Sequence, residues 1–380
     1  MKKLPKFIEM LRQLIAIPSI SSTDKKFDIS NKKMIDLLSE WFESVGFSIE
    51  IQVVSEEHKK FNMIAYKGNK KGGLLLSGHT DTVSFNEKFW KFNPFKLTEK
   101  NHNLYGLGVV DMKIFFVIIL SILSKINLKK IKHPLYILAT SDEETTMFGI
   151  KHFVKNKKFF PKYAIIGEPT SLNIIRGHKG YFSAIIQVFG KSAHSSNPAK
   201  GINAIEIMQK IIDLLKILRE NLTNKYKNIN FNVPYPTINI GKIHGGDSTN
   251  KVCDFCELHI DIRPTPNISI DNIYYELNSM FSINKKILKY TKIKELYPCI
   301  PSYECKKDNF LVKKVESLIQ KPSSFVNYCT EASFLQKCCP VIVLGPGSIE
   351  QAHKADEFIS INDTCKGINF FKKIIKYFCL

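Results

Sequence analysis

The feature that most constrains the fold of this 380-residue chain is a series of short apolar segments separated by helix-like segments. Residues 74–77, 135–140, 163–166 and 341–344 are predicted strands of this kind. Apolar strands that alternate with helices are typical of a largely parallel sheet whose faces are covered by helices. We therefore expect an α/β fold, in which a mixed sheet carries helices on both faces.

The middle of the chain departs from this alternation. Here periodicity predicts strands at 182–189, 237–243 and 252–262, and helices at 204–222 and 270–281. The order β-α-β-β-α is typical of an inserted α+β domain of ferredoxin-like type. The sequence thus predicts a discontinuous catalytic domain over 1–181 and 295–380, with a second domain inserted at 182–294. Further helices are predicted at 6–16, 31–45, 114–127, 309–320 and 362–378, and further strands at 47–54 and 63–66.

Composition narrows the class of partner. Only four of the 55 Lys and Arg residues are Arg, although the formal charge is +20. Nucleic-acid binding relies on Arg for bidentate contacts, so we interpret the charge as a bias in residue usage and expect no nucleic-acid partner. The longest apolar run, 114–123, is shorter than the roughly 20 residues of a membrane span, so we expect no membrane insertion. Nine Cys without an export signal favour reduced thiols and a cytoplasmic location.

Residues that can bind metals stand where the apolar strands end. In α/β sheets, functional sites gather at the carboxyl ends of the strands. Each position has a commonplace alternative, such as a helix N-cap for Asp111 or a solvated loop for the acidic run after 135–140. Together they supply the imidazoles and carboxylates that a site for two metal ions needs. The candidates are His79, Asp111, Glu143, Glu144, Glu168 and His353.

These motifs, in this order and over essentially the whole chain, resemble those of the di-zinc aminoacylase/carboxypeptidase family. Within the family, the chain is most similar to the bacterial acetylornithine deacetylases, through segments such as 233–237, 243–247, 327–332 and 344–349. The shared motifs are Ile17-Pro18-Ser19, Gly78-His79-Thr80-Asp81, Asp111-Met112-Lys113, Asp142-Glu143-Glu144, Gly167-Glu168-Pro169, Gly190-Lys191-Ser192-Ala193-His194-Ser195 and His353.

The resemblance implies two Zn²⁺ per subunit, with Co²⁺ as a substitute. It also implies that the inserted domain acts as a lid and in dimerisation, so that His194 stabilises the oxyanion in the partner subunit's site of a homodimer. By the same resemblance, His79 and Glu168 would bind one ion, Glu144 and His353 would bind the other, and Asp111 would bridge both. Glu143 would be the general base, and Asp81 would orient His79.

Substrate contacts are expected from both domains. The resemblance implies that Asn250, Arg263 and Thr330 help to bind the substrate, with Arg263 at its α-carboxylate. A carboxylate is also needed for the free ammonium of acetylated ornithine, and Glu331 is our hypothesis for it. The alternative, that Glu331 caps a helix at 331–337, stays open.

The implied activity is removal of the acetyl group from N2-acetyl-L-ornithine, a step of arginine biosynthesis, to give L-ornithine and acetate. The alternatives are succinyl-diaminopimelate desuccinylase, a broad-specificity aminoacylase, or a metal-free anion-binding protein on the same fold. Two departures from the family pattern bear on activity. Ile114 replaces a usual Gly beside the expected bridging carboxylate, and Glu350 replaces a neutral residue near His353.

Overall fold

The computed structural model describes residues 4–68, 71–156, 158–282 and 285–380. The chain divides into two compact units, the second of which interrupts the first. Its main junctions lie at 176/177 and 304/305, whereas the sequence pattern predicted 181/182 and 294/295. Unit 1 comprises Met1–Arg176, Cys305–Ser324 and Thr330–Leu380, and unit 2 comprises Gly177–Glu304 and Phe325–Cys329.

Unit 1 is built on a mixed sheet, which confirms the predicted fold class. Its four central strands, β6, β3, β7 and β15, are parallel to one another. At one end of this group, β2 pairs antiparallel with β6, and β1 pairs antiparallel with β2. At the other end, β8 pairs antiparallel with β15. The order is β1 (Ser48–Ser55), β2 (Lys60–Lys67), β6 (Leu135–Thr140), β3 (Leu74–His79), β7 (Tyr163–Ile166), β15 (Val341–Val343), β8 (Ile174–His178) and β13 (Tyr303–Glu304), with β14 (Ser323–Val326) also paired to β8. All of β13 and the last two residues of both β8 and β14 belong to unit 2.

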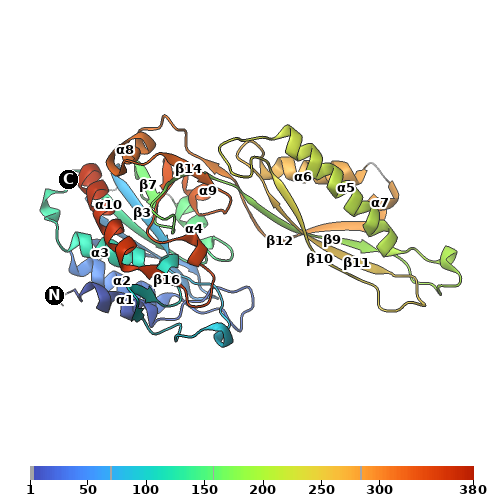
Figure 1. Cartoon of the computed structure of the whole chain (residues 1–380), viewed down its shortest axis with the longest axis horizontal. Coiled ribbons are helices and arrows are strands. Elements are labelled where there is room, and N and C mark those ends of the chain that lie inside the picture. Colours follow the sequence, from blue (N-terminus) through green and yellow to red (C-terminus); the bar gives the residue numbers. More distant parts are fainter. Residues whose placement is uncertain (1–3, 69–70, 157, 283–284) are drawn as a thin grey trace. The chain divides into compact units, whose positions relative to one another are not determined.

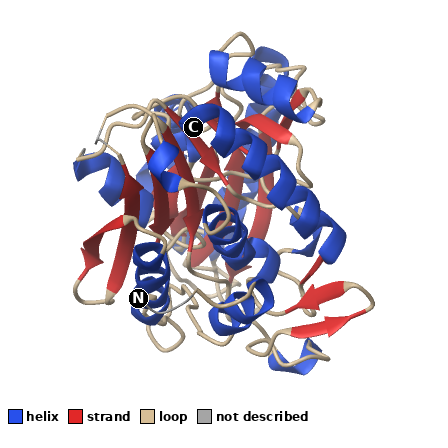
Figure 2. Cartoon of the chain, turned by 90° about the vertical axis from the view of Figure 1, so that its left-hand side faces the viewer, coloured by secondary structure: helices blue, strands red, loops and turns tan. Residues whose placement is uncertain are grey.

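Two groups of helices pack on this sheet. Figure 1 shows β3 between α3 and α10 on one side and α4 and α9 on the other. Every residue of α3 is buried, because α1, α2 and α10 pack against it. Figure 2 shows helices lying across the strands of the sheet. The helices are α1 (Phe7–Ile15), α2 (Lys32–Ser44), α3 (Ile114–Leu123), α4 (Phe148–Asn156), α8 (Phe310–Ile319), α9 (Ala332–Leu335) and α10 (Ile361–Cys379).

The predicted elements of unit 1 recur within a few residues of their expected bounds, but several strands of two to four residues were not predicted, and neither were α4 and β8. Both are short, and α4 contains Gly149, so the sequence carries little periodic signal there. A small separate sheet joins β16 (Phe358–Ser360), β5 (Asn103–Tyr105) and β4 (Thr98–Lys100). Among the described residues, no helix has the length and apolar character needed to cross a membrane.

Unit 2 is a four-stranded antiparallel sheet with two long helices, in the order β10-β11-β9-β12. Alternate residues of β11 (Cys256, Leu258, Ile260, Ile262) are buried with α5 and α6 in one apolar core. The chain order β-α-β-β-α-β and this strand order are those of a ferredoxin-like fold. The elements are β9 (Tyr181–Phe189), α5 (Ala204–Lys225), β10 (Thr237–Gly245), β11 (Phe255–Arg263), α6 (Ile270–Ser282), α7 (Lys285–Tyr290) and β12 (Thr291–Ile300).

The last strand of this unit, β12, was not predicted. It contains alternating Lys and Glu with only a few apolar residues, and most of its side chains are at least partly exposed. An edge strand with one solvated face shows weak hydrophobic periodicity. The predicted domain boundary at 294/295 therefore falls inside β12.

Buried His178, at the end of β8, generates a prediction on pH. Burial lowers its pKa to about 4, below the roughly 6.5 of an unfolded histidine. The unfolded chain therefore binds an extra proton between these pH values, and the free energy of unfolding falls as pH decreases from 6.5 to 4. One such site contributes up to about 1.4 kcal/mol per pH unit.

His178→Gln removes this proton uptake. Denaturant titrations at pH 7.5 and 5.0 will show a smaller loss of stability in the variant than in the wild-type chain. Exposed His102→Gln is the matched control and is expected to behave as wild type. Identical pH dependence in all three proteins would contradict this account.

Candidate metal centre

The predicted ligands converge at one edge of the unit 1 sheet. β3 ends at His79, the Asp142-Glu143-Glu144 loop follows β6, and Glu168 follows β7. Because these strands are parallel neighbours, their carboxyl ends meet at the same edge. Asp111 comes from the turn before α3, and His353 from the loop after β15.

Asp111 lies between the two histidines. Its Oδ1 is 2.9 Å from His79 Nε2, and its Oδ2 is 3.4 Å from His353 Nε2. On the outer sides, Glu168 Oε1 is 3.8 Å from His79 Nε2, and Glu144 Oε1 is 3.0 Å from His353 Nε2. A carboxylate flanked in this way is placed to bridge two cations, each with one imidazole and one further carboxylate.

Among the described residues, two groups of side chains could each hold a metal ion, because the ligand atoms within each group all lie within 4.8 Å of one another. One contains His79, Asp111 and Glu144, and the other contains His79, Glu143 and Glu168. Glu143 is thus as close to the centre as the predicted ligands. Its position alone does not separate a base from a ligand.

The electrostatics of the cluster indicate a shortage of positive charge. Burial and the Glu168 carboxylate raise the pKa of Glu143 well above its usual range. Burial and Asp111 likewise raise the pKa of both Glu144 and Glu168. Carboxylates that repel one another in this way favour a bound cation or a retained proton.

The histidines respond in the opposite direction. Burial lowers the pKa of His79, but Glu168 and Asp111 outweigh this and raise it well above normal. Hydrogen bonds to Asp111 and Glu144 raise the pKa of His353 to about 10. For Asp111 itself, burial raises the pKa, but the hydrogen bonds with His353 and His79 lower it overall.

Asp81 contacts His79 and also the acidic loop that carries Glu143 and Glu144. The His79 Nδ1 atom lies 3.0 Å from the backbone oxygen of Asp81 and 3.5 Å from its Oδ1. The two Asp81 carboxylate oxygens accept the backbone N–H groups of Glu143 and Glu144 at 3.2 and 3.1 Å. Asp81 therefore connects the imidazole at the end of β3 to the acidic loop after β6.

Lys60, on β2, also contacts the acidic loop, and sequence reasoning missed it. Its side chain is only 2% exposed, and its Nζ lies 2.7 Å from Asp28 Oδ1 and 3.0 Å from Asp142 Oδ1. Ser21 Oγ also donates to Asp142 Oδ1 at 3.0 Å. Among so many lysines, nothing local in the sequence marks this one as buried.

Glu357 was also missed. Its buried carboxylate accepts three backbone N–H groups from the turn that carries Asp111. Burial and Asp111 raise the pKa of Glu357 to about 8, and these hydrogen bonds oppose the rise. Its spacing of four residues from His353 is the one signal that could have drawn attention to it.

Glu331 and Thr330 lie at the start of α9. The alternative that Glu331 caps this helix is wrong, because its side chain makes no capping bond, whereas Thr330 Oγ1 accepts the N–H of Ala332 at 3.2 Å. Glu331 is 1% exposed, and neither carboxylate oxygen completes a hydrogen bond with a described residue, although Ser77 and Thr140 are near. Burial raises its pKa to about 7.

The three remaining predicted residues belong to unit 2. His194 Nδ1 accepts the backbone N–H of Ser196 at 3.2 Å, and Asn250 is exposed beside it, with its carbonyl accepting the N–H of Ser195. Arg263 donates two hydrogen bonds to Asp261, at 2.8 and 3.0 Å. Its guanidinium therefore already has a carboxylate partner in the protein.

The two departures from the family pattern differ in their surroundings. Ile114 is fully buried at the first position of α3. The Glu350 side chain is 79% exposed and lies 3.9 Å from Lys354. Solvent and this lysine screen its charge, so Glu350 adds little to the field at the centre.

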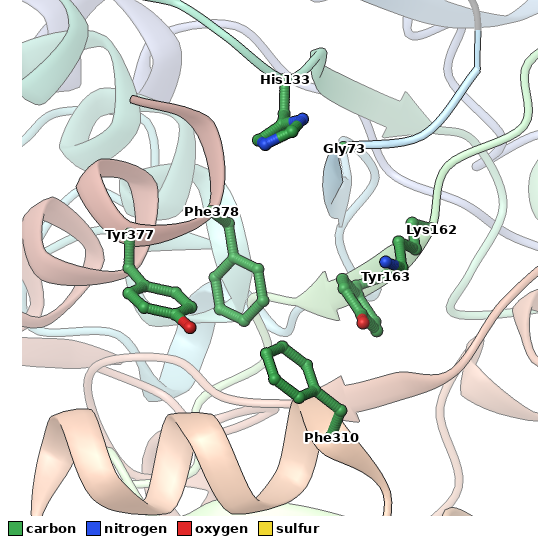
Figure 3. Close-up of a pocket in the computed structure, with 7 residues that line it drawn as sticks. All are labelled: Gly73, His133, Lys162, Tyr163, Phe310, Tyr377 and Phe378. Atoms are coloured by element: carbon green, nitrogen blue, oxygen red, sulfur yellow. The ribbon is translucent and has the colours of Figure 1, made fainter.

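A separate cavity lies near the amino ends of β3 and β7, away from the ligands. Its volume is about 430 Å³, and no carboxylate is among the residues that define it. Figure 3 shows Phe378 between Tyr377 and Tyr163, with Phe310 close to them. The lining residues are Gly73, His133, Lys162, Tyr163, Phe310, Tyr377 and Phe378.

The model of peptidase family M20/M25/M40 matches residues 75–377, most of the chain. This chain belongs to peptidase family M20/M25/M40. Its relatives include proteins named acetylornithine deacetylase from Erwinia tasmaniensis, with 49% identity over 99% of both chains, and from Proteus mirabilis, with 50% identity over 100% of this chain and 98% of the relative. The predicted family is thus confirmed.

Solved structures agree with the M20 fold. A metallo-carboxypeptidase from Sulfolobus solfataricus has a TM-score of 0.79 at 19% identity, covering 99% of both chains. A dinuclear metal-binding M20 peptidase from Bacillus subtilis has a TM-score of 0.67 at 14% identity, covering 97% of this chain and 96% of that one. At these identities the likeness is one of fold.

The buried Lys60 gives a prediction on stability. Lys60→Met will lower the free energy of unfolding by about 3 kcal/mol or more, because the buried carboxylates of Asp28 and Asp142 lose the ammonium group that balances their charge. Adding Asp142→Asn will restore part of the loss. Denaturant titration measures both effects. Lys25→Met, which breaks the exposed pair with Glu57, is the control and will leave stability unchanged; equal losses in the two lysine variants would contradict the prediction.

Proposed function

We propose that this M20 protein is a metal-dependent amide hydrolase that removes the acetyl group from N2-acetyl-L-ornithine, giving L-ornithine and acetate. The observation that carries the proposal is the Asp111 carboxylate between two imidazole–carboxylate pairs, with Glu143 beside them. The relatives named acetylornithine deacetylase, alike over their full length, support the choice of substrate.

The residues present fit a pair of divalent cations. The raised pKa values of Glu143, Glu144 and Glu168 arise from burial and mutual repulsion, which two divalent cations would relieve. His79 and Glu168 would hold one ion, Glu144 and His353 the other, and Asp111 both. Imidazole and carboxylate ligands suit Zn²⁺, and Co²⁺ could replace it.

Such ions, when bound, lower the pKa of coordinated water and polarise an amide carbonyl. Glu143 is then the group that takes the proton from the attacking water and passes it to the leaving amine. Burial and Glu168 raise the pKa of Glu143, which makes its carboxylate a stronger base toward the attacking water. Asp81 holds Glu143 in place through its backbone N–H.

His194 is proposed to stabilise the oxyanion, in the partner subunit's site of a homodimer. Its Nδ1 accepts a backbone N–H, so the neutral ring carries its proton on Nε2. An Nε2–H group is the donor that a developing oxyanion needs. Asn250, beside it in unit 2, is proposed to contact the substrate from the same side.

The substrate's charged groups suggest two further contacts. Arg263 is proposed to bind the α-carboxylate, which would have to compete with Asp261 for the guanidinium. Glu331, whose buried carboxyl group has no completed hydrogen bond among the described residues, is proposed to attract the δ-ammonium. Thr330 would act next to Glu331, where its hydroxyl already supports α9.

The cellular setting is part of the proposal. The nine cysteines, all in the described part of the chain, form no disulfide, which agrees with a reducing cytoplasm. Acetylornithine hydrolysis would place the enzyme in arginine biosynthesis. Desuccinylation of succinyl-diaminopimelate and broad aminoacylase activity are the nearest enzymatic alternatives, and a metal-free anion-binding role would leave the acidic cluster without its cations.

The direct test is product analysis on the purified, metal-loaded protein. We expect release of acetate and ornithine from acetylornithine, much faster than any release of succinate from succinyl-diaminopimelate, with two zinc ions per chain. Preference for the succinylated substrate, or metal-loaded protein without hydrolysis, would refute the proposal.

The role of Glu143 gives a second prediction. Glu143→Gln keeps the size of the side chain but removes its ability to accept a proton, so kcat will fall by about 100-fold or more. Metal content per chain will stay at the wild-type level, because the side chain is not a proposed ligand. Exposed Glu56→Gln is the control. Full activity of Glu143→Gln, or loss of a metal ion from it, would show that the assignment is wrong.

Glu331 is tested through substrate preference. If its carboxylate attracts the ammonium, Glu331→Gln will lower kcat/KM for acetylornithine about tenfold, the scale of one charge-assisted hydrogen bond. Acetylmethionine, which has no ammonium, will be hydrolysed at the wild-type rate. Equal losses for both substrates would mean that Glu331 acts only on the structure of the site.

A further inference from the structure

We infer that Glu357 is a positioning residue for the metal centre: its buried carboxylate holds the turn that presents Asp111, and so determines how the two ion positions are bridged. This inference rests on the proposed function. Glu357 is 2% exposed, and it lies on the loop that follows His353. It is not among the predicted ligands, and it contacts the backbone of the turn that carries Asp111.

The contacts are specific to the turn. Glu357 Oε2 accepts the N–H of Gly108 at 2.8 Å, while Oε1 accepts the N–H groups of Val110 at 2.8 Å and Asp111 at 3.1 Å. The backbone oxygen of Glu357 also accepts the N–H of Gly106 at 3.1 Å. One residue thus binds the segment 106–111 at four backbone positions.

The turn depends on such a partner because its backbone is irregular. Gly108 has a φ of +73°, and Asp111 and Met112 have non-helical dihedral angles just before α3. Their N–H groups are therefore not arranged to join the hydrogen-bond ladder of a helix. Buried N–H groups without an acceptor are costly, and the Glu357 carboxylate satisfies those of Val110 and Asp111.

The same loop also supplies a predicted ligand. His353 lies four residues before Glu357, and its Nε2 faces Asp111 Oδ2 at 3.4 Å. The segment 353–357 therefore contacts Asp111 at two points. His353 lies against its carboxylate, and Glu357 accepts its backbone N–H. Displacement of this segment would move both groups, so the bridge and the second ion position are linked.

A carboxylate is needed because three donors must be accepted. Glutamine has one oxygen and an NH₂ group, so at least one backbone N–H of the turn would face another donor. Glu357→Gln thus disturbs the turn without creating a cavity. Partners of this kind behind a metal ligand typically change metal affinity by about 10–100-fold.

The test titrates Co²⁺ into the metal-free protein by calorimetry and follows the spin coupling of the cobalt pair by EPR. In Glu357→Gln, we expect one ion to bind about as in wild type, the second at least tenfold more weakly, and the coupling to be reduced. The kcat for acetylornithine will fall more than KM changes. A residue that only stabilised the fold would leave coupling in the loaded protein intact.

Asp356→Asn is the matched control. Asp356 is the adjacent carboxylate, and its Oδ1 accepts the N–H groups of Lys91 at 2.8 Å and Phe92 at 3.2 Å, in a loop that holds no predicted ligand. This variant will bind two coupled ions as wild type does. Thermal unfolding of both metal-free variants shows whether they are folded.

If Glu357→Gln does not fold, Glu357→Asp replaces it, because the shorter carboxylate keeps the charge but cannot reach all three N–H groups. Weak binding of the second ion by the folded variant supports the inference. Wild-type affinity and coupling in the folded variant overturn it. A wild-type protein that binds no ion pair would instead overturn the proposed function.

Discussion

The structure depends on holding several carboxylates close together at the buried edge of one sheet. Burial and mutual repulsion raise the pKa of Glu143, Glu144 and Glu168, so this arrangement opposes its own ionisation. Among the described residues, the imidazoles of His79 and His353 are the two that lie against these carboxylates. Because these buried carboxylates repel one another, the cluster favours small, highly charged cations, which is the basis of the proposed hydrolase chemistry.

Anchors behind the ligands make the arrangement possible. Asp81 accepts backbone N–H groups of the acidic loop, and Lys60 pairs with Asp142 at the start of that loop. Glu357 accepts backbone N–H groups of the turn before α3. Each anchor is buried and comes from a different part of the chain. The ligands are thus held in place before any ion binds, which favours precise geometry.

The sequence predicted most strands of the main sheet and the side chains that meet at its edge, because these signals are local. Apolar strands that end in His79 or Glu168 are visible in a few consecutive residues. The anchors were not visible, since Glu357 meets Gly108 and Lys60 meets Asp142 only after the chain has folded. β12 was missed because its solvated face leaves the strand little hydrophobic periodicity, and the burial of the Glu331 carboxylate follows from packing that no local pattern encodes.

An anomalous difference map from crystals of the cobalt-loaded protein would show directly whether these side chains hold a pair of ions. We expect two peaks joined by Asp111, one at about 2.0–2.2 Å from His79 and Glu168 and the other at that distance from Glu144 and His353. Glu143 would contact neither ion. A single peak, peaks at other residues, or Glu143 bound directly to an ion would contradict this expectation.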